Sequence, residues 1–283
     1  MLFAALAGLS GLVWGVGDFA GGKAAQGAAA LPVAWLSKLV GLPLLGIYLA
    51  ATYQPFAATA VGWGGLAGCF GVLGMILFYR ALAQGAMTVV APVTAVTSAA
   101  IPVVVGLISG ERPPPLRLAG VVCALAAIAL VSLAPPRPGE RVIVTGRLVG
   151  TAVLSGVGFA LFFVFVAQAG DLANGEPGLW PIAASQLGAL LLSSLLLVST
   201  RPTGWPRGVS LRWTFLAGPL DMTAHVLYLL ATRQGELSLV APLAALYPVT
   251  TVVLAMIIDR ERVRSLQIAG LVLALAALLL VAT

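Results

Sequence analysis

The sequence has very few charged residues. Only 8% of its 283 residues are Asp, Glu, Lys or Arg, whereas 60% are hydrophobic. An ordinary soluble domain carries about 25% charged residues, so a chain of this composition could not cover a surface exposed to water. The composition therefore excludes a soluble protein and indicates one embedded in a membrane.

Residues suited to enzymatic or metal chemistry are equally scarce. The chain has one histidine and two cysteines, and both Cys69 and Cys123 lie in apolar stretches without metal-ligand spacing. It contains no Walker sequence, dinucleotide fingerprint, nucleophile elbow or His-Glu-x-x-His motif. Its basic residues form no patch with interleaved aromatics, which argues against nucleic acid as a partner. We therefore expect no enzyme active site, no cofactor, no metal and no drive by ATP.

Long apolar runs, in contrast, are abundant. A bilayer core of about 30 Å requires about 20 mostly apolar residues per helix, and ten such runs follow one another with short connections. The predicted spans are 2–20, 30–52, 62–82, 86–109, 116–134, 147–169, 178–199, 211–232, 237–258 and 265–283. A polar, proline-rich linker, 135–146, separates a first unit, 1–134, from a second, 147–283. The first run lacks a basic n-region and a small-residue cleavage site, so we expect a retained helix rather than a signal peptide.

The sequence also matches itself. When it is shifted by 150 residues, 63–133 aligns with 213–283 without a gap. The matched pairs include Trp63 with Trp213, Gln84-Gly85 with Gln234-Gly235, Ala91-Pro92 with Ala241-Pro242, and Glu111-Arg112 with Glu261-Arg262. The first helices match less well, through Gly15-Val16-Gly17 and Gly156-Val157-Gly158.

The duplication determines the expected architecture. Each unit holds five spans, an odd number, so equivalent helices must cross the bilayer in opposite directions. The sequence thus predicts an all-α polytopic membrane protein whose ten transmembrane helices form two inverted five-helix repeats. Such repeats are typical of secondary transporters, because the two halves can exchange the side that their shared site faces.

Four short motifs stand at fixed places in this layout. They are Trp14-Gly15 in the first span, Gln84-Gly85 before the fourth, Ala91-Pro92 within it and Glu111-Arg112 before the fifth, and the last three recur at Gln234, Ala241 and Glu261. The pattern resembles the drug/metabolite transporter superfamily, EamA type, over essentially the whole chain. The resemblance implies a central cavity lined by the first four helices of each unit. It also implies that the fifth and tenth helices lie outside, as braces or as a homodimer contact.

Ionisable residues within spans point to a site, because each costs about 2.5 to 3.5 kcal/mol near mid-bilayer. Asp18 follows Trp14 by one turn on the same helix face, where it could bind a proton or a cationic group beside the indole. The alternative is an interfacial Asp18 paired with Lys23. Lys38 lies well inside the second span, which favours an anionic substrate or an internal partner, with Asp18 as the candidate. The alternative is a lysine that snorkels to water.

Three residues of the eighth span share one helix face. Asp221, His225 and Tyr228 stand at i, i+4 and i+7, and His225 is the only histidine of the chain. The Asp221–His225 pair suits proton coupling, although a structural hydrogen-bonded pair is the alternative. The equivalent residues of the first unit carry no charge: Gly71, Met75 and Phe78. This asymmetry favours a site over a scaffold.

Two tyrosines and four prolines complete the candidates. Tyr79 near the end of the third span and Tyr247 beside Pro248 have amphipathic rings suited to lining a cavity. Each proline removes a backbone donor, and the freed carbonyls are tolerated only against protein or water. We therefore expect hinges at Pro92, Pro102, Pro242 and Pro248. The loop glutamates Glu111 and Glu261 are expected to cap helix ends or latch loops.

The basic residues of the loops predict the orientation. Three of them, Arg112, Arg117 and Arg233, fall on the face that also holds the termini. The other face carries the remainder: Lys23, Arg80, Arg137, Arg141, Arg147, Arg201, Arg207, Arg212, Arg260, Arg262 and Arg264. The positive-inside rule makes this second face cytoplasmic and both termini external, whereas the family resemblance implies termini inside.

Together these observations predict a secondary transporter that moves a small organic solute, such as a metabolite, amino acid or drug, by alternating access. We expect export, coupled to protons through Asp18 or the Asp221–His225 pair, in a bacterial inner membrane. Uptake of a metabolite is the alternative. A channel-like facilitator is a weaker one, because no ring of repeated polar residues occurs. The expected partners are a small-molecule substrate and membrane lipid, with the protein a monomer or homodimer.

Overall fold

The regular structure of the described chain is entirely helical. The computed structural model describes residues 1–51, 56, 58–82, 87–133, 145–171, 178–258, 260 and 264–283. Its helices are α1 (Leu2–Ala25), α2 (Ala30–Ala51), α3 (Ala58–Leu82), α4 (Met87–Ile108), α5 (Pro115–Val131), α6 (Gly146–Asp171), α7 (Trp180–Thr200), α8 (Gly208–Thr232), α9 (Leu237–Ala244), α10 (Tyr247–Ile258) and α11 (Ser265–Ala282). Most of the predicted linker and the pairs at Gln84 and Glu261 fall outside the described residues.

These helices account for all ten predicted spans. Nine described segments are long and apolar enough to cross a membrane, and one of them, Leu237–Ile258, consists of α9 and α10 together. The tenth span is α5, a shorter apolar helix of 17 residues. The prediction of an all-α membrane protein is therefore confirmed.

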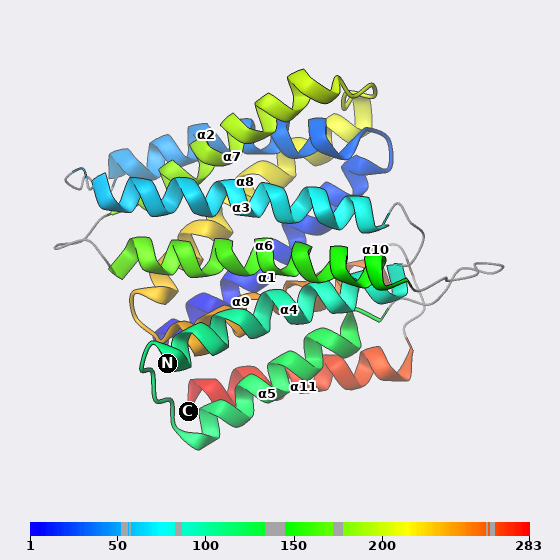
Figure 1. The fold of residues 1–283 in the computed structure, drawn as a ribbon. Helices are drawn as coiled ribbons and strands as arrows, with labels where there is room; N and C mark the ends of the chain where they lie inside the picture. The colour runs from blue at the N-terminus through cyan, green and yellow to red at the C-terminus, as the bar shows by residue number, and fades with distance from the viewer. Residues whose placement is uncertain are drawn as a thin grey trace.

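Equivalent helices of the two halves run in opposite directions. In Figure 1 the colour gradient follows α1 and α3 from left to right, whereas their counterparts α6 and α8 run from right to left. Both chain termini lie on the same side, because ten crossings return the chain to where it began. This is the inverted repeat that an odd number of spans per half predicts.

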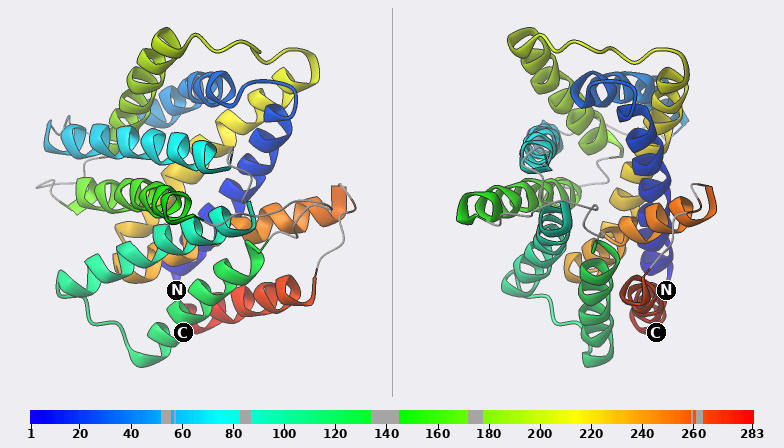
Figure 2. Two further views of the ribbon diagram at one scale, coloured as in Figure 1. Left: turned by 45° about the vertical axis from the view of Figure 1, so that its right-hand side comes forward. Right: turned by 90° about the vertical axis from the view of Figure 1, so that its right-hand side faces the viewer.

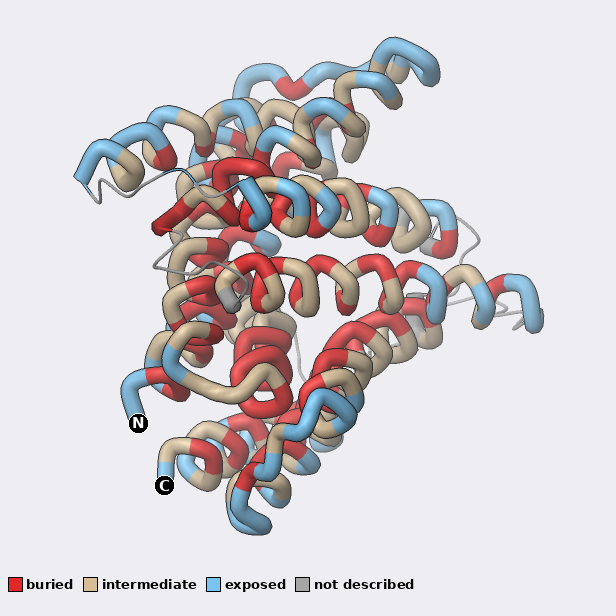
Figure 3. Tube along the Cα trace, turned by 60° about the vertical axis from the view of Figure 1, so that its left-hand side comes forward, coloured by how far each residue is buried: buried red, intermediate tan, exposed pale blue. Residues whose placement is uncertain are grey.

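The helix packing repeats with the sequence. α3 packs along α6 and α7, and its counterpart α8 packs along α1 and α2. α5 packs on α11 through equivalent contacts, since Gly120 lies against Leu280 and Gly270 lies against Leu130. This pair forms the lower edge of the bundle in Figure 1, as the resemblance implied for the fifth and tenth spans. Buried residues follow the inner faces of the helices, and exposed ones lie on outer faces and at helix ends (Figure 3).

Two serine hydrogen bonds show which residues of α1 and α6, the first helices of the two halves, are equivalent, and they differ from the match predicted from the sequence. Ser10 Oγ donates to the carbonyl of Ala224, and Ser155 Oγ donates to that of Gly74, each over 2.8 Å. Gly74 and Ala224 are equivalent in the 150-residue shift, so Ser10 and Ser155 are equivalent too. The sequence match at Gly156 was therefore displaced by about one helical turn. Glycine-rich helices align in several registers, and only the packing selects one.

The ninth span is broken between α9 and α10. Ala245 and Leu246 separate the two helices, and the break lies just before Pro248, which has no N–H to bond the carbonyl of Ala244. The equivalent of Pro248 in α4 is Ser98, which keeps its backbone donor, and α4 is continuous. Of the two equivalent helices, only the one with proline at this position is broken, although α4 stays continuous at its own two internal prolines.

The four predicted hinges therefore divide into two groups. Pro248 lies at the break, whereas Pro92, Pro102 and Pro242 lie inside continuous helices. The two sides of the break also differ in packing. Every residue of α9 from Ser238 onward is buried, but none of α10 is, and Figure 2 shows the far end of α10 leaving the neighbouring helices.

Basic residues gather at one end of the bundle. The described members lie at helix ends on the side opposite the termini (Figure 1). They are Lys23, Arg80, Arg147, Arg201, Arg207, Arg212, Arg260 and Arg264. Arg112, Arg117 and Arg233 lie on the terminal side. We call these two sides the basic end and the terminal end.

Candidate functional site

An ion pair between α2 and α8 forms the centre of the site. Lys38 Nζ lies 2.5 Å from Asp221 Oδ2. The glycine at 218 brings these residues together, because without a side chain it lets the Ser37 carbonyl of α2 approach α8 closely. The exposed fractions of the two side chains are 21% for Lys38 and 27% for Asp221. The pair is therefore enclosed by helices but not sealed from solvent.

This ion pair corrects one prediction from the sequence. Asp18 was the expected counter-ion of Lys38, but the structure pairs Lys38 with Asp221 instead. The reason is that α2 packs extensively along α8 and only slightly against α1. Lys23, the other residue considered as a partner for Asp18, lies over the Phe19 ring, with its Nζ 5.5 Å from the centroid.

His225 adds a second titratable group to Asp221. His225 Nδ1 lies 3.5 Å from Asp221 Oδ2 and 2.6 Å from the backbone carbonyl of the same residue. A carbonyl can only accept, so Nδ1 carries a proton in this arrangement and Nε2 is the site that gains or loses one. The Asp221 carboxylate thus lies between an ammonium and an imidazole, which confirms that the two predicted residues meet.

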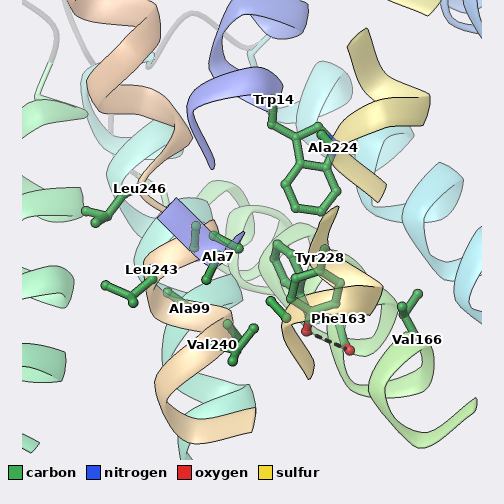
Figure 4. Close-up of a cluster of buried hydrophobic side chains, with 14 of the residues drawn as sticks. Ala7, Trp14, Ala99, Phe163, Val166, Ala224, Tyr228, Val240, Leu243 and Leu246 are labelled. Carbon is green, nitrogen blue, oxygen red and sulfur yellow. Dashed lines mark hydrogen bonds between the residues drawn. The ribbon is translucent and has the colours of Figure 1, made fainter. Parts of the chain in front are cut away.

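An aromatic cluster encloses the buried side of this group. It consists of Trp14, Phe162, Phe163, His225 and Tyr228, contributed by α1, α6 and α8. The Trp14 ring centroid lies 5.2 Å from that of His225 and 5.6 Å from that of Phe163. Figure 4 shows Trp14 directed toward Phe163 and Tyr228. The site therefore joins both repeats, as an inverted-repeat transporter requires.

Tyr228 belongs to the packed part of this cluster. Its side chain is fully buried, and its hydroxyl donates to the Phe163 carbonyl over 3.0 Å (Figure 4). In this conformation the ring does not reach solvent, so we leave Tyr228 out of the proposed binding site. The side chain of Tyr79 lies outside the described part of the structure.

Asp18 and Tyr247 extend the site toward α10. The Asp18 side chain is exposed, yet it interacts electrostatically with Lys38 of α2, Asp221 of α8 and Tyr247 of α10. The backbone before Asp18 packs on two of these helices, since Gly17 lies against α8 and Gly15 lies against α10. We find no hydrogen bond or ion pair to Asp18 within the part of the chain that the structure describes.

Sequence reasoning missed three residues of the site. Gln186 of α7 is buried and donates from Nε2 to the Lys38 carbonyl over 2.6 Å, while Phe162 and Phe163 complete the aromatic cluster. Equivalent close contacts of Ser37 and Ser185 make Lys38 and Gln186 counterparts. Because the two counterparts touch, they lie near the pseudo-two-fold axis. The packing alone shows this equivalence, because the 150-residue shift matches Lys38 with Gly188, and nothing in the sequence marked Gln186 or the phenylalanines.

Glu111 caps a helix of the other half at the terminal end. Its Oε1 and Oε2 accept from the backbone N–H groups of Leu237 and Ser238 at distances of 2.7 and 2.8 Å. These are the first two residues of α9, whose donors have no partner within the helix. The carboxylate also opposes the positive end of the helix dipole. The capping role predicted for Glu111 is thus confirmed, and it joins the end of α4 to the start of α9.

We expect Glu111→Gln to lower the free energy of unfolding by about 1 to 2 kcal/mol, because one amide oxygen replaces two charged acceptors. The change is measurable by denaturant titration of the purified protein. Arg112→Gln is the matched control, since among the described residues the exposed Arg112 guanidinium donates only to the carbonyls of Leu107 and Glu111. It should change stability by less than about 0.5 kcal/mol. Equal losses in both variants would contradict the cap.

Comparison with known proteins identifies the family. The sequence model of the EamA-like transporter family matches residues 1–133 and 145–283, which is almost the whole chain. The chain belongs to the EamA-like transporter family. Membership of this family implies movement of a small molecule across a membrane, by a multi-pass integral membrane protein that is not an enzyme.

Two further comparisons concern curated proteins and solved structures. No curated protein matches the chain. A solved crystal structure, described only as that of a protein, superimposes with a TM-score of 0.76 over 98% of this EamA-like chain and 95% of the other. Their sequences are 18% identical, so this likeness supports the fold alone.

Proposed function

We propose that this protein is a secondary carrier that exports a small organic solute in exchange for protons. The observation that carries the proposal is the group formed by Asp18, Lys38, Asp221 and His225, which lie on α1 and α2 of the first repeat and on α8 of the second. Protonation of any carboxylate in this group changes the charge that the site presents. A transported solute and a proton can therefore compete for the same place.

The packing around α9 and α10 supports alternating access. At the terminal end the Glu111 cap and the buried α9 close the bundle, while at the basic end α10 has no buried residue. The two helices meet at the break directly before Tyr247, which interacts electrostatically with Asp18. A change of packing at α10 would reach the titratable group directly. Under the positive-inside rule the basic end, where α10 is less buried, faces the cytoplasm, which suits loading for export.

The test has two steps. A thermal-shift screen of amino acids, nucleosides and cationic drugs first supplies a ligand, whose pH-gradient-driven flux is then measured in proteoliposomes. We expect Asp18→Asn or Asp221→Asn to lower this flux at least about tenfold, the effect of losing one charge interaction of about 1.4 kcal/mol. Glu236→Gln, which neutralises a carboxylate at the terminal end, is the control and should keep the flux. Intact flux in both aspartate variants would refute proton coupling.

Counterflow separates a carrier from a channel-like facilitator. Unlabelled solute on the far side accelerates exchange of labelled solute through a carrier, because the loaded site returns faster than the empty one. A channel shows no such acceleration. The same vesicles, with a reporter fused to one terminus, distinguish export from uptake once the orientation of the protein is known.

A further inference from the structure

We propose that the solute is a monovalent organic cation, recognised by the Asp18 carboxylate through a positively charged nitrogen. This inference rests on the proposed function and names the chemistry of its substrate. It depends on how the charges of the site are already paired, on where Asp18 lies, and on the side chains around it.

The charges of the site leave one negative charge without a partner. Lys38 and Asp221 neutralise each other across 2.5 Å, and we count His225 as neutral because its ring is buried between Trp14 and Phe162, where a charged ring is costly. An ionised Asp18 is then the unmatched charge. An unpaired charge within a membrane protein is costly. The site is therefore completed by one positive charge, supplied either by a proton or by a cationic ligand.

The same pairing argues against an anionic solute. Lys38 is the only lysine or arginine found deep within a described span, and its ammonium already contacts Asp221. An anion would have to displace that carboxylate and would then face both Asp18 and Asp221. Like charges that share one site repel where water is scarce. A solute with positively charged nitrogen meets no such barrier.

The surroundings of Asp18 add an apolar and aromatic requirement. The Tyr247 ring is half-buried and interacts electrostatically with Asp18, whereas the Trp14 indole, one turn away on α1, is buried in the aromatic cluster and contributes apolar surroundings. Aromatic rings bind organic ammonium groups through their faces and bind apolar bodies through contact area. An aromatic or alkyl amine carries both features, whereas a small inorganic cation lacks the second.

The experiment compares three phenyl-bearing probes of similar size that carry different charges. Phenethylamine is a cation, 2-phenylethanol is neutral and phenylacetate is an anion, and their affinities for the purified full-length protein are measured by calorimetry. We expect phenethylamine to bind at least about tenfold more tightly than either analogue, which corresponds to about 1.4 kcal/mol. Tighter binding of phenylacetate, or equal binding of all three, overturns the inference.

Proton competition supplies an independent readout. Alkylamines stay protonated between pH 5 and 8, as the lysine side chain does, so only the protein titrates in this range. We expect the affinity for phenethylamine to fall as pH falls, by up to about tenfold per pH unit, because protons occupy the same carboxylate. The groups facing Asp18 are Asp221, Lys38 and Tyr247, with His225 behind Asp221. Affinity that does not change with pH overturns the shared site.

Variants test whether Asp18 is the residue that binds the cation, and they separate this inference from the proposed transport function. Asp18→Asn should lose both the cation preference and the pH dependence while its thermal unfolding stays cooperative. Glu236→Gln, the control, should retain both. If Asp18→Asn keeps the preference, the assignment to Asp18 is wrong. Proton-coupled transport of a neutral or anionic solute would contradict the cation inference but not the proposed function. Cation binding without flux would contradict the proposed function but not the cation inference.

Discussion

Replacing Lys38 by methionine is expected to abolish transport and to destabilise the protein by about 3 kcal/mol. Breaking a buried ion pair by removing one partner costs about 3 to 5 kcal/mol, because the remaining charge stays enclosed without compensation. The lower value applies here, since 27% of the Asp221 side chain is exposed. Asp221→Asn should act in the same direction, by leaving the Lys38 ammonium alone beside Gln186 and the aromatic cluster.

The double variant Lys38→Met/Asp221→Asn separates stability from transport. With both charges removed, no uncompensated ion remains, so we expect at least about 2 kcal/mol of the loss to be recovered. Flux should not recover, because the titratable group is gone. Stability is measured by denaturant titration and flux is measured in proteoliposomes, for the unchanged protein, the two single variants and the double variant. If the two single losses simply add in the double variant, Lys38 and Asp221 do not interact and the pair is misassigned.

Most of the fold could be predicted because it depends on patterns that occur twice. Apolar runs of membrane-spanning length located the ten helices, and the 150-residue shift indicated their inverted arrangement. The register of α1 against α6 could not be predicted, since Gly-x-Gly segments match at several offsets and the hydrogen bonds of Ser10 and Ser155 decide between them. The break at Ala245 was foreseen only as one of four proline hinges, because a proline shows where a donor is missing but not whether the helix tolerates the loss.

The sequence predicted which charged residues belong to the site but not which of them form pairs. Intramembrane charge alone marked Asp18, Lys38, Asp221 and His225, because each is too costly to keep without a role. Their pairing depends on which helices lie side by side, and the sequence does not state that α2 follows α8 more closely than α1. The same limit hid Phe162, which is an ordinary apolar residue until its ring meets the His225 ring, with centroids 4.9 Å apart.

Among glycine-to-alanine substitutions, Gly68→Ala is expected to disrupt the bundle most. A Cβ at Gly68 would clash with the carbonyl oxygen of Ser185 in α7 and would lie 2.7 Å from the Ser185 carbonyl carbon and 2.9 Å from the Ala189 nitrogen. All three are backbone atoms, so no side chain can move aside, and α3 and α7 must separate. Overpacking costs about 1 to 3 kcal/mol and occasionally more, and we expect the upper end of this range, measured as loss of folded protein by size exclusion and thermal unfolding.

The inverted repeat supplies both a replicate and a control for this substitution. Gly218 of α8 is the counterpart of Gly68, and its added Cβ would meet the Ser37 carbonyl of α2, so Gly218→Ala should cause a similar loss and should also part Lys38 from Asp221. Gly62→Ala adds the same methyl group to α3 where nothing lies within 4 Å. It should be neutral or stabilise by up to about 1 kcal/mol, because alanine favours the helix. Comparable losses at Gly62 and Gly68 would show that flexibility of the glycine backbone, rather than close helix contact, determines stability.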